Sequence, residues 1–239
     1  MKASPALRTT ASPGPRRRPE NGGYARGDEV RNRILLAAIE LFGEQGFASA
    51  STRAIAARAG VNPPALQYYF HNKARLHQAC GQYIADRIKD HVREPMARAA
   101  LSLQAADKAA APDLLWALID TVIEHSSTDA EIPGWTQFLA HAALEVTDTS
   151  LAIIHREAVA PLFDCVAALI ALAWGRPADD EMARLNAVLL LSQTRALGAQ
   201  RQITLTMMGW PDLENGRLAT AKRCLHALVT SLIANPPPA

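Results

Sequence analysis

Hydrophobic residues recur at intervals of three and four positions along most of this chain, which is the spacing that one face of an α-helix requires. In the N-terminal third, Ile34, Leu35, Ala38, Leu41 and Phe42 make one such stripe. Prolines and glycines stand mainly between the periodic segments, and no alternating strand pattern of useful length interrupts them. The pattern predicts an all-α protein.

This stripe predicts a first helix with Asp28 as its N-cap that runs to about Gln45, where Gly46 ends it by adopting the left-handed conformation. A second helix of barely two turns should follow, capped by Ser51 and closed by Gly60. Two helices with clear start and stop signals are therefore expected near the N-terminus.

A third helix should begin near Asn62, since Pro63 and Pro64 suit a first turn whose amides have no intrahelical partner. Because a residue before proline is pushed out of the α region, either Asn62 or Pro63 could stand at the cap. Asn72 is then expected to cap a longer helix, about 73–93, that connects this small bundle to the rest of the chain.

Beyond residue 93 the periodic segments predict six further helices, separated by breakers that contain proline or glycine. Pro161 lies inside one of them and should kink or interrupt it. The last two carry apolar stripes that could be ordinary core or an intersubunit bundle. The expected ranges are 95–105, 112–126, 133–145, 149–174, 179–200 and 212–234.

Composition divides the chain into four segments. Residues 1–26 are rich in proline and glycine with few large apolar side chains, so a disordered basic arm is expected there. Its three consecutive arginines, 16–18, could be a solvated charge run or could follow a DNA groove. Residues 27–75 should form the small bundle and 76–234 a larger helical domain, and 235–239 a tail.

Charge is divided unevenly between the two ends of the chain. Residues 1–93 carry 15 lysines and arginines against 7 acidic residues, a net charge of +8, whereas residues 94–239 carry 10 against 16, a net charge of −6. A basic segment is typical of proteins that bind the phosphate backbone of nucleic acids, and an acidic one would be repelled by it. The N-terminal part is therefore the expected nucleic-acid binder.

The second and third helices are joined by the turn Gly60-Val61-Asn62, and Leu66 and Phe70 stand four apart on the third, where they should pack inward. This leaves Ala65, Gln67, Tyr68 and His71 turned outward or sideways. Such a pair of helices is built to enter a DNA major groove.

The stretch from Arg31 to about Cys80 resembles the DNA-binding domain of the TetR family of bacterial transcriptional regulators. Within that family the chain is most similar to the CecR branch, on Phe42-Gly43-Glu44, Tyr68-Tyr69-Phe70 and a late Gly209-Trp210-Pro211. The residues that meet the family pattern are Ala37, Ala38, Leu41, Phe42, Gly46, Ile55, Ala56, Ala59, Gly60, Val61, Leu66, Tyr68, Phe70 and Lys73.

The resemblance implies an all-α homodimer in which an N-terminal three-helix helix-turn-helix bundle binds a double-stranded DNA operator and a C-terminal helical domain binds a small-molecule effector and forms the dimer. Ser51 and Arg53 resemble phosphate contacts, and Tyr68 and Lys73 resemble clamps on the DNA backbone. The residues implied at the DNA are Ser51, Thr52, Arg53, Asn62, Pro63, Pro64, Ala65, Gln67, Tyr68, His71 and Lys73. The expected mechanism is repression that the effector relieves.

The third helix departs from the commoner family pattern at Pro63-Pro64, at Ala65 and at Gln67. Glutamine can bond N6 and N7 of adenine together, and alanine or proline can contact the thymine methyl group. These residues predict a site with A·T pairs under the third helix, although Gln67 could equally be a solvated side chain.

Candidate effector contacts on the middle helices are Trp116, Trp135, Phe138 and His141, which could also be ordinary core residues. The resemblance places the dimer surface on the last two long helices. There Leu185, Leu189, Leu225, Leu228 and Leu232 are the candidate interface residues.

Other classes of function find less support in the residues. No hydrolase, zinc-protease or phosphate-loop motif occurs, so no catalytic residue is predicted, and catalysis is the most remote alternative. His77 and Cys80 could share a metal only with further ligands, so neither metal nor cofactor is expected. Uninterrupted apolar runs are too short to cross a bilayer, which predicts a cytoplasmic protein. An architectural DNA-binding protein without an effector is the nearer alternative.

Overall fold

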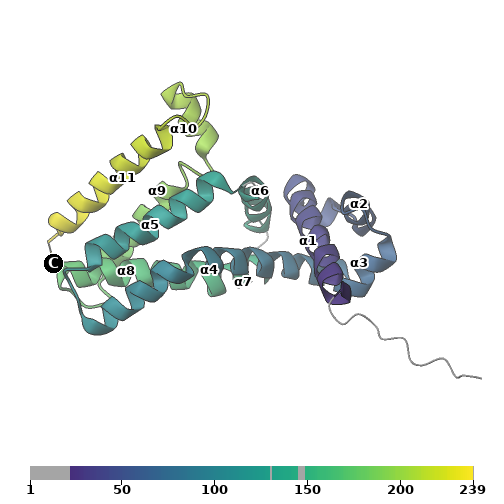
Figure 1. Cartoon of the computed structure of the whole chain (residues 1–239), viewed down its shortest axis with the longest axis horizontal. Coiled ribbons are helices and arrows are strands. Elements are labelled where there is room, and N and C mark those ends of the chain that lie inside the picture. Colours follow the sequence, from purple (N-terminus) through teal and green to yellow (C-terminus); the bar gives the residue numbers. More distant parts are fainter. Residues whose placement is uncertain (1–21, 130, 145–148, 239) are drawn as a thin grey trace, which may run out of the picture.

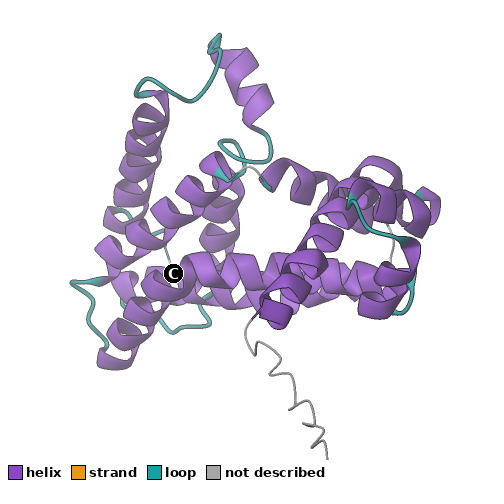
Figure 2. Cartoon of the chain, turned by 45° about the vertical axis from the view of Figure 1, so that its right-hand side comes forward, coloured by secondary structure: helices purple, strands orange, loops and turns teal. Residues whose placement is uncertain are grey.

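The computed structural model describes residues 22–129, 131–144 and 149–238, and within these ranges the chain is helical with no β-strand. A small bundle of α1, α2 and α3 lies at one end of the molecule, and the long helix α4 runs from it into the C-terminal helices at the other end (Figure 1). Turning the molecule shows the same division, with short loops between most helices (Figure 2). The expectation of an all-α fold is confirmed.

Helix α1 spans Gly22–Ser49, so it starts before the expected cap at Asp28. Most of the expected basic arm, residues 1–21, lies outside the described residues, and the backbone of its last five residues belongs to α1. Gly46 interrupts the helix as predicted, but its φ of 74° is combined with a ψ of 166°, which is an extended conformation open almost only to glycine.

Helix α2 spans Thr52–Arg58 and α3 spans Pro63–Phe70. Both expected caps are confirmed: Ser51 Oγ accepts the Ala54 N–H at 3.1 Å, and Asn62 Oδ1 accepts the Ala65 N–H at 3.0 Å. The cap of α3 is therefore Asn62, and Pro63 is the first helical residue.

The turn between α2 and α3 is closed by two backbone hydrogen bonds. Val61 N–H donates to Ala56 O at 3.0 Å and Gly60 N–H donates to Ala57 O at 3.1 Å, the pattern of a Schellman motif. Gly60 has a φ of 66°, as this motif requires. The side chain of Val61 packs against the hydrophobic core, so the turn is fixed from both sides.

Helix α4 spans Lys73–Ala105, capped by Asn72, whose Oδ1 accepts the Arg75 N–H at 2.8 Å. It absorbs the separate helix expected over 95–105, because it continues through Pro95. Proline removes one helical donor, but Val92, Ala99 and Pro95 itself are buried, so packing outweighs the local cost.

The next helices form the middle of the chain. Helix α5 spans Ala111–Thr128, α6 spans Ile132–Ala142, α7 spans Thr149–Ile154 and α8 spans Ala160–Trp174. A π-helical turn, η1, at His155–Val159 joins α7 to α8 immediately before Pro161. The expected interruption at Pro161 is therefore a π-turn rather than a break in the chain.

Helix α9 spans Glu181–Thr194 and is shorter than expected, and α11 spans Arg217–Ala234. Between them lies α10, Arg201–Met208, in a region expected to be a connection. Only Leu205 of α10 is buried, while Ile203, Met207 and Met208 are 60%, 82% and 55% exposed. Helix α10 has only eight residues, which is too short for a helical period to stand out in the sequence.

The buried apolar side chains form two clusters. The first joins α1, α2, α3 and the start of α4 to residues of α6, and the second joins the end of α4 to α5, α8, α9 and α11. By length and composition alone the helical run 149–174 could cross a bilayer, a test that the core helix of a soluble protein also passes. In this fold its apolar residues are divided between the two clusters, with Ile154 and Ala158 in the first and Val166 and Ile170 in the second.

Gly81 of α4 lies so close to α7 that a Cβ there would stand 2.8 Å from the Cα, Cβ and O atoms of Ser150. We expect Gly81→Ala to lower the free energy of unfolding by about 1–3 kcal/mol, because backbone atoms cannot move aside as a flexible side chain can. Urea denaturation of the two proteins measures the difference.

The matched control is Gly27→Ala in α1, where the nearest neighbour of the new Cβ would be the Tyr69 hydroxyl at an ordinary 3.7 Å. Alanine favours a helix by up to about 1 kcal/mol over glycine, so this variant should be at least as stable as the parent. Equal stability of the Gly81→Ala variant and the parent would contradict the close approach of α4 and α7.

Candidate nucleic-acid interface and ligand cavity

Helix α3 presents its polar and aromatic face to solvent. Tyr68 is 80% exposed, and Gln67, Pro63 and Pro64 are exposed as well. Leu66 and Phe70 are buried on the opposite face, in the first cluster. The inward position of Leu66 and Phe70, expected from their i, i+4 spacing, is confirmed. The opposite face of α3 is exposed to solvent.

Two ion pairs connect α2 to α1, the helix that packs against it. Arg58 donates to both carboxylate oxygens of Glu44 at 3.0 and 3.1 Å, and also to Glu40 at 3.2 Å. The hydrogen bonds from Arg58 hold the pKa of Glu44 below its usual value. The bidentate geometry fixes the direction of α2, and through the closed turn it fixes α3.

A hollow of about 460 Å³ lies between the start of α2 and both ends of α3. Its lining includes the cationic side chains of Arg53 and Lys73 and no carboxylate. The structure brings together most of the residues expected at DNA, because the hollow is lined by Thr52, Arg53, Pro63, Pro64, Leu66, Gln67, His71, Asn72 and Lys73. Of the other expected residues, Ser51, Asn62 and Tyr68 are exposed nearby and Ala65 is half-buried.

Lys73, which was expected to clamp the DNA backbone, makes two contacts within the chain. Its Nζ donates to the Ala48 carbonyl at 3.0 Å and lies 4.7 Å from the centre of the Phe47 ring. The ammonium group therefore fastens the first turn of α4 to the end of α1, and a phosphate would have to share it or take it from that carbonyl.

A second, larger space lies in the C-terminal domain. It is a cavity of about 560 Å³ between α4, α5, α6, the α7–α8 segment and the chain after α9. Its walls are mostly apolar, with Ile84, Ile88 and Val92 from α4 and Trp135 and Leu139 from α6. The few polar groups on its wall are those of His125, Ser126, Thr136, His155 and Arg195. A mostly apolar cavity with a few polar groups is typical of a small-molecule site.

One of the four expected effector contacts, Trp135, lines this cavity. Phe138 is buried in the first cluster, Trp116 makes an edge contact with His226 at 4.6 Å, and His141 stands 3.2 Å from where a Cβ on Gly46 would lie. These three residues make contacts between helices instead and are not among the residues that line the cavity.

Charged and polar groups gather at the end of the cavity where α4 and α5 meet. Burial lowers the pKa of His125 to about 4, with its neighbour His91 adding to the effect, so the imidazole is neutral at physiological pH. Arg87 lies 3.3 Å from Asp129. Burial and a hydrogen bond to Glu131 raise the pKa of Tyr83 to about 12.

Helix α6 connects the cavity to the DNA-side bundle. Trp135 and Leu139 face the cavity, while Gln137 and Phe138 face α1. At Gly43 of α1 a Cβ would lie 2.9 Å from Gln137 Cβ and 3.0 Å from Phe138 N, so the two helices cross without room for a side chain. Sequence inspection found Gly43 only as part of a motif, since a helical glycine does not reveal which helix approaches it.

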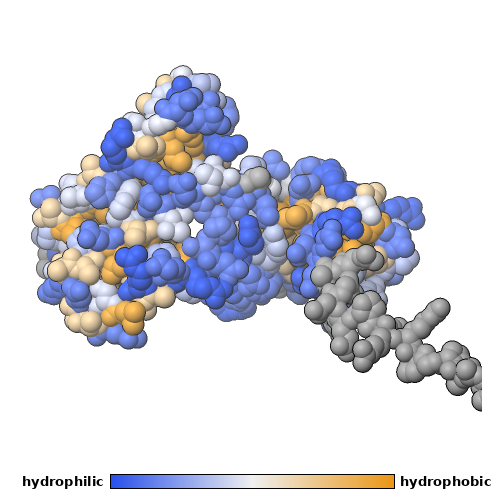
Figure 3. Space-filling model, viewed as in Figure 1, coloured by the Kyte–Doolittle hydropathy of each residue, from blue (hydrophilic) through white to orange (hydrophobic). Residues whose placement is uncertain are grey.

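The leucines expected at a dimer surface divide into two groups. Leu185, Leu189 and Leu228 are 48%, 52% and 54% exposed, whereas Leu225 and Leu232 pack in the second cluster of the same chain. Val188, from the same apolar stripe, is 49% exposed on α9. Hydrophobic patches also break the hydrophilic surface over the C-terminal helices (Figure 3).

Two known families match this sequence. Residues 34–80 match the bacterial regulatory proteins of the tetR family, and residues 111–235 match the C-terminal domain of the HTH-type transcriptional dual regulator CecR. The first match covers the bundle with the exposed helix α3, and the second covers the helices around most of the cavity wall.

Curated relatives agree with these matches. The HTH-type transcriptional dual regulator CecR of Shigella flexneri is 31% identical over 188 residues, which are 77% of this chain and 82% of that protein. The HTH-type transcriptional activator FasR of Mycolicibacterium smegmatis is 38% identical over 80 residues, or 31% of this chain and 36% of the relative.

Solved structures share the fold. A transcriptional regulator of Pseudomonas aeruginosa PAO1 has a TM-score of 0.64 at 16% identity, covering 90% of this chain and 97% of that one. AibR, solved with isovaleryl coenzyme A and operator DNA, has a TM-score of 0.59 at 17% identity, covering 83% and 97%. With both halves matched in sequence, the chain belongs to the TetR family of bacterial transcriptional regulators, with a C-terminal domain of the CecR type, and is not an enzyme.

Proposed function

We propose that this regulator binds a palindromic operator as a homodimer and leaves it when a small apolar effector fills the cavity next to α6. The observation that carries the proposal is the two-sided position of α6, which lines the cavity with Trp135 and crosses α1 at Gly43. The action is that of a cytoplasmic repressor whose ligand acts through helix packing.

The DNA contact follows from the exposed face of α3. Gln67 has a free side chain with both donor and acceptor groups, and Pro63, Pro64 and Ala65 offer apolar surface beside it. This combination suits A·T pairs in the major groove. Arg53 and the exposed hydroxyl of Tyr68 flank it and suit phosphate contacts.

A dimer is needed because two recognition helices must enter successive major grooves about 34 Å apart on one face of the duplex. The half-exposed Leu185, Val188 and Leu189 on α9 and Leu228 on α11 supply apolar surface for the contact. Such residues on the last long helices suit a four-helix interface between two copies of the chain.

The effector is expected to be a largely apolar compound, because the cavity walls are mostly aliphatic and aromatic. The solved neighbour AibR was obtained with isovaleryl coenzyme A and operator DNA, which is a precedent for the fold and not a statement about this chain. A compound that displaces Trp135 or Leu139 moves α6. Helix α1 then moves with it, because the two helices pack in direct contact at Gly43.

Gln67→Ala is expected to weaken binding to an operator selected from random duplexes by about 1–3 kcal/mol and to flatten the preference at one A·T pair. Fluorescence anisotropy at fixed salt measures the affinity. Gln104→Ala, at an exposed position near the end of α4, is the control and should bind like the parent. An unchanged base preference in the Gln67 variant would rule out readout by this side chain.

Leu189→Glu should convert the dimer to a monomer, because a charge would be buried at a contact between two copies. Sedimentation velocity measures the change, and operator affinity should fall with it. The control is Leu101→Glu, since Leu101 is 68% exposed on α4, away from α9 and α11. A Leu189→Glu protein that remains dimeric would place the interface elsewhere.

Thr136→Trp should abolish the response to effector while operator binding persists, because the larger side chain would occupy the cavity that Thr136 lines. A thermal-shift screen finds stabilising compounds, and DNA release by each compound is then compared between variant and parent. Thr206→Trp, the same change on the exposed side of α10, is the control.

Full response in the Thr136→Trp protein would refute the cavity as the effector site. Binding to all duplexes with equal affinity and no effect of any compound would instead favour an architectural DNA-binding protein.

A further inference from the structure

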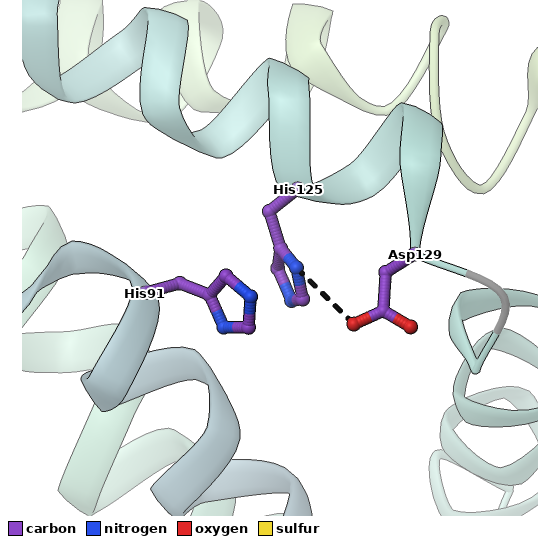
Figure 4. Close-up of side chains that lie close together, drawn as sticks. All are labelled: His91, His125 and Asp129. Carbon is purple, nitrogen blue, oxygen red and sulfur yellow. Dashed lines mark ion pairs between the residues drawn. The ribbon is translucent and has the colours of Figure 1, made fainter.

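Three side chains with metal-binding donors meet at the junction of α4 and α5. They are His91 from α4 and His125 and Asp129 from the end of α5, and their donor atoms lie within 4.8 Å of one another (Figure 4). His125 and Asp129 are one helical turn apart, so they share a face of α5, while His91 approaches from the facing helix. The close-up shows the two rings and the carboxylate side by side.

His91 is arranged as a ligand. Its Nδ1 lies 2.7 Å from the carbonyl oxygen of Arg87, one turn earlier in α4, and only a protonated Nδ1 can donate to that oxygen. The neutral ring then carries its lone pair on Nε2. A backbone carbonyl that fixes the tautomer of a ligating histidine in this way is the usual outer-shell partner of a metal-bound imidazole.

Asp129 is held in a similar way. Its Oδ1 accepts the backbone N–H of Glu131 at 2.8 Å, which orients the carboxylate so that Oδ2 stands 3.4 Å from His125 Nδ1. Arg87 Nη2 also lies 3.3 Å from Oδ2 and is the cation that an incoming ion would displace from this oxygen. Tyr83 engages Glu131 instead, so it does not compete for Asp129.

His125 lacks the partners that a buried imidazole needs. Its side chain is 10% exposed, and among the described residues neither ring nitrogen makes a hydrogen bond, because the neutral ring approaches Asp129 Oδ2 only to 3.4 Å. A buried polar atom without a partner is costly, so such atoms in native proteins commonly mark a ligand or ion. His125 also lines the cavity, which leaves one side of the cluster open to it.

We propose that His91, His125 and Asp129 bind one divalent transition-metal ion of the zinc, cobalt or nickel class at the end of the cavity. Two imidazole nitrogens and one carboxylate oxygen suit these ions, whereas calcium and magnesium require more oxygen ligands. The three protein ligands leave a fourth position toward the cavity, where water or an oxygen or nitrogen donor of a bound compound completes the coordination.

Binding requires side-chain rotation. The two imidazole rings are stacked, with centres 3.5 Å apart and planes inclined by 25°, so at least one ring must turn its edge to the ion. Metal–nitrogen bonds of about 2.0–2.1 Å draw the donors closer together than they are in the ion-free arrangement. Because His91 is on α4, the ion would join the helix that follows α3 to the wall of the cavity.

The test uses the full-length protein without a histidine tag, stripped with a chelator and titrated with Co²⁺ while its visible absorption is recorded. We expect one Co²⁺ per chain with the strong visible bands of a four-coordinate site, and displacement by Zn²⁺. His91→Ala and Asp129→Asn should each weaken Co²⁺ binding by at least about a hundredfold. Circular dichroism and thermal melting establish that each variant is folded.

The control is His155→Ala, because His155 lines the same cavity but is outside the cluster, and this variant should bind Co²⁺ like the parent. If the His91→Ala protein does not fold, the Asp129→Asn protein still tests the site. Asparagine has nearly the same volume as aspartate, so this change should not disturb the packing. No saturable binding by the parent, or equal affinities of the parent and the Asp129→Asn protein, would overturn the proposal.

Discussion

Helices α1 and α6 meet at Gly43 with no side chain between them, and the rest of the architecture depends on this contact. The first hydrophobic cluster is not confined to the DNA-side bundle, because Trp135 and Phe138 of α6 are part of it. The core of the bundle therefore includes side chains from the C-terminal part of the chain. Any change that α6 undergoes on its other side reaches the helix that supports α2 and α3, since close-packed interiors transmit displacement.

Helix α4 supplies the second connection between the two ends. Its first residue, Lys73, is fastened to the end of α1 through Ala48 and Phe47, and its later turns contribute Ile84 and Val92 to the cavity wall. The orientation of α3 is consequently determined twice, by α1 from behind and by α4 from its end. Two connected supports hold α3 in a fixed orientation, which is what binding in a groove at fixed spacing requires.

Much of the N-terminal bundle could be predicted from the sequence because its signals are local: Ser51, Asn62 and Asn72 cap their own helices, and Gly60 closes its own turn. The cavity could not be predicted in the same way. Phe138 and His141 carry the same residue-level signal as Trp135, and only the position of α1 decides which of them face the cavity. The continuation of α4 through Pro95 likewise depends on burial by distant helices.

The entry of α3 limits how this protein can hold the DNA backbone. Pro63 and Pro64 have no amide hydrogen, and the amide of Ala65 is already bonded to Asn62 Oδ1. Helix N-termini often capture phosphates with free amides, but the first three helical residues of α3 have none to offer. Contacts to the sugar-phosphate backbone must therefore come from side chains and from the neighbouring helices. The first turn of α3 can then present an apolar surface to the bases.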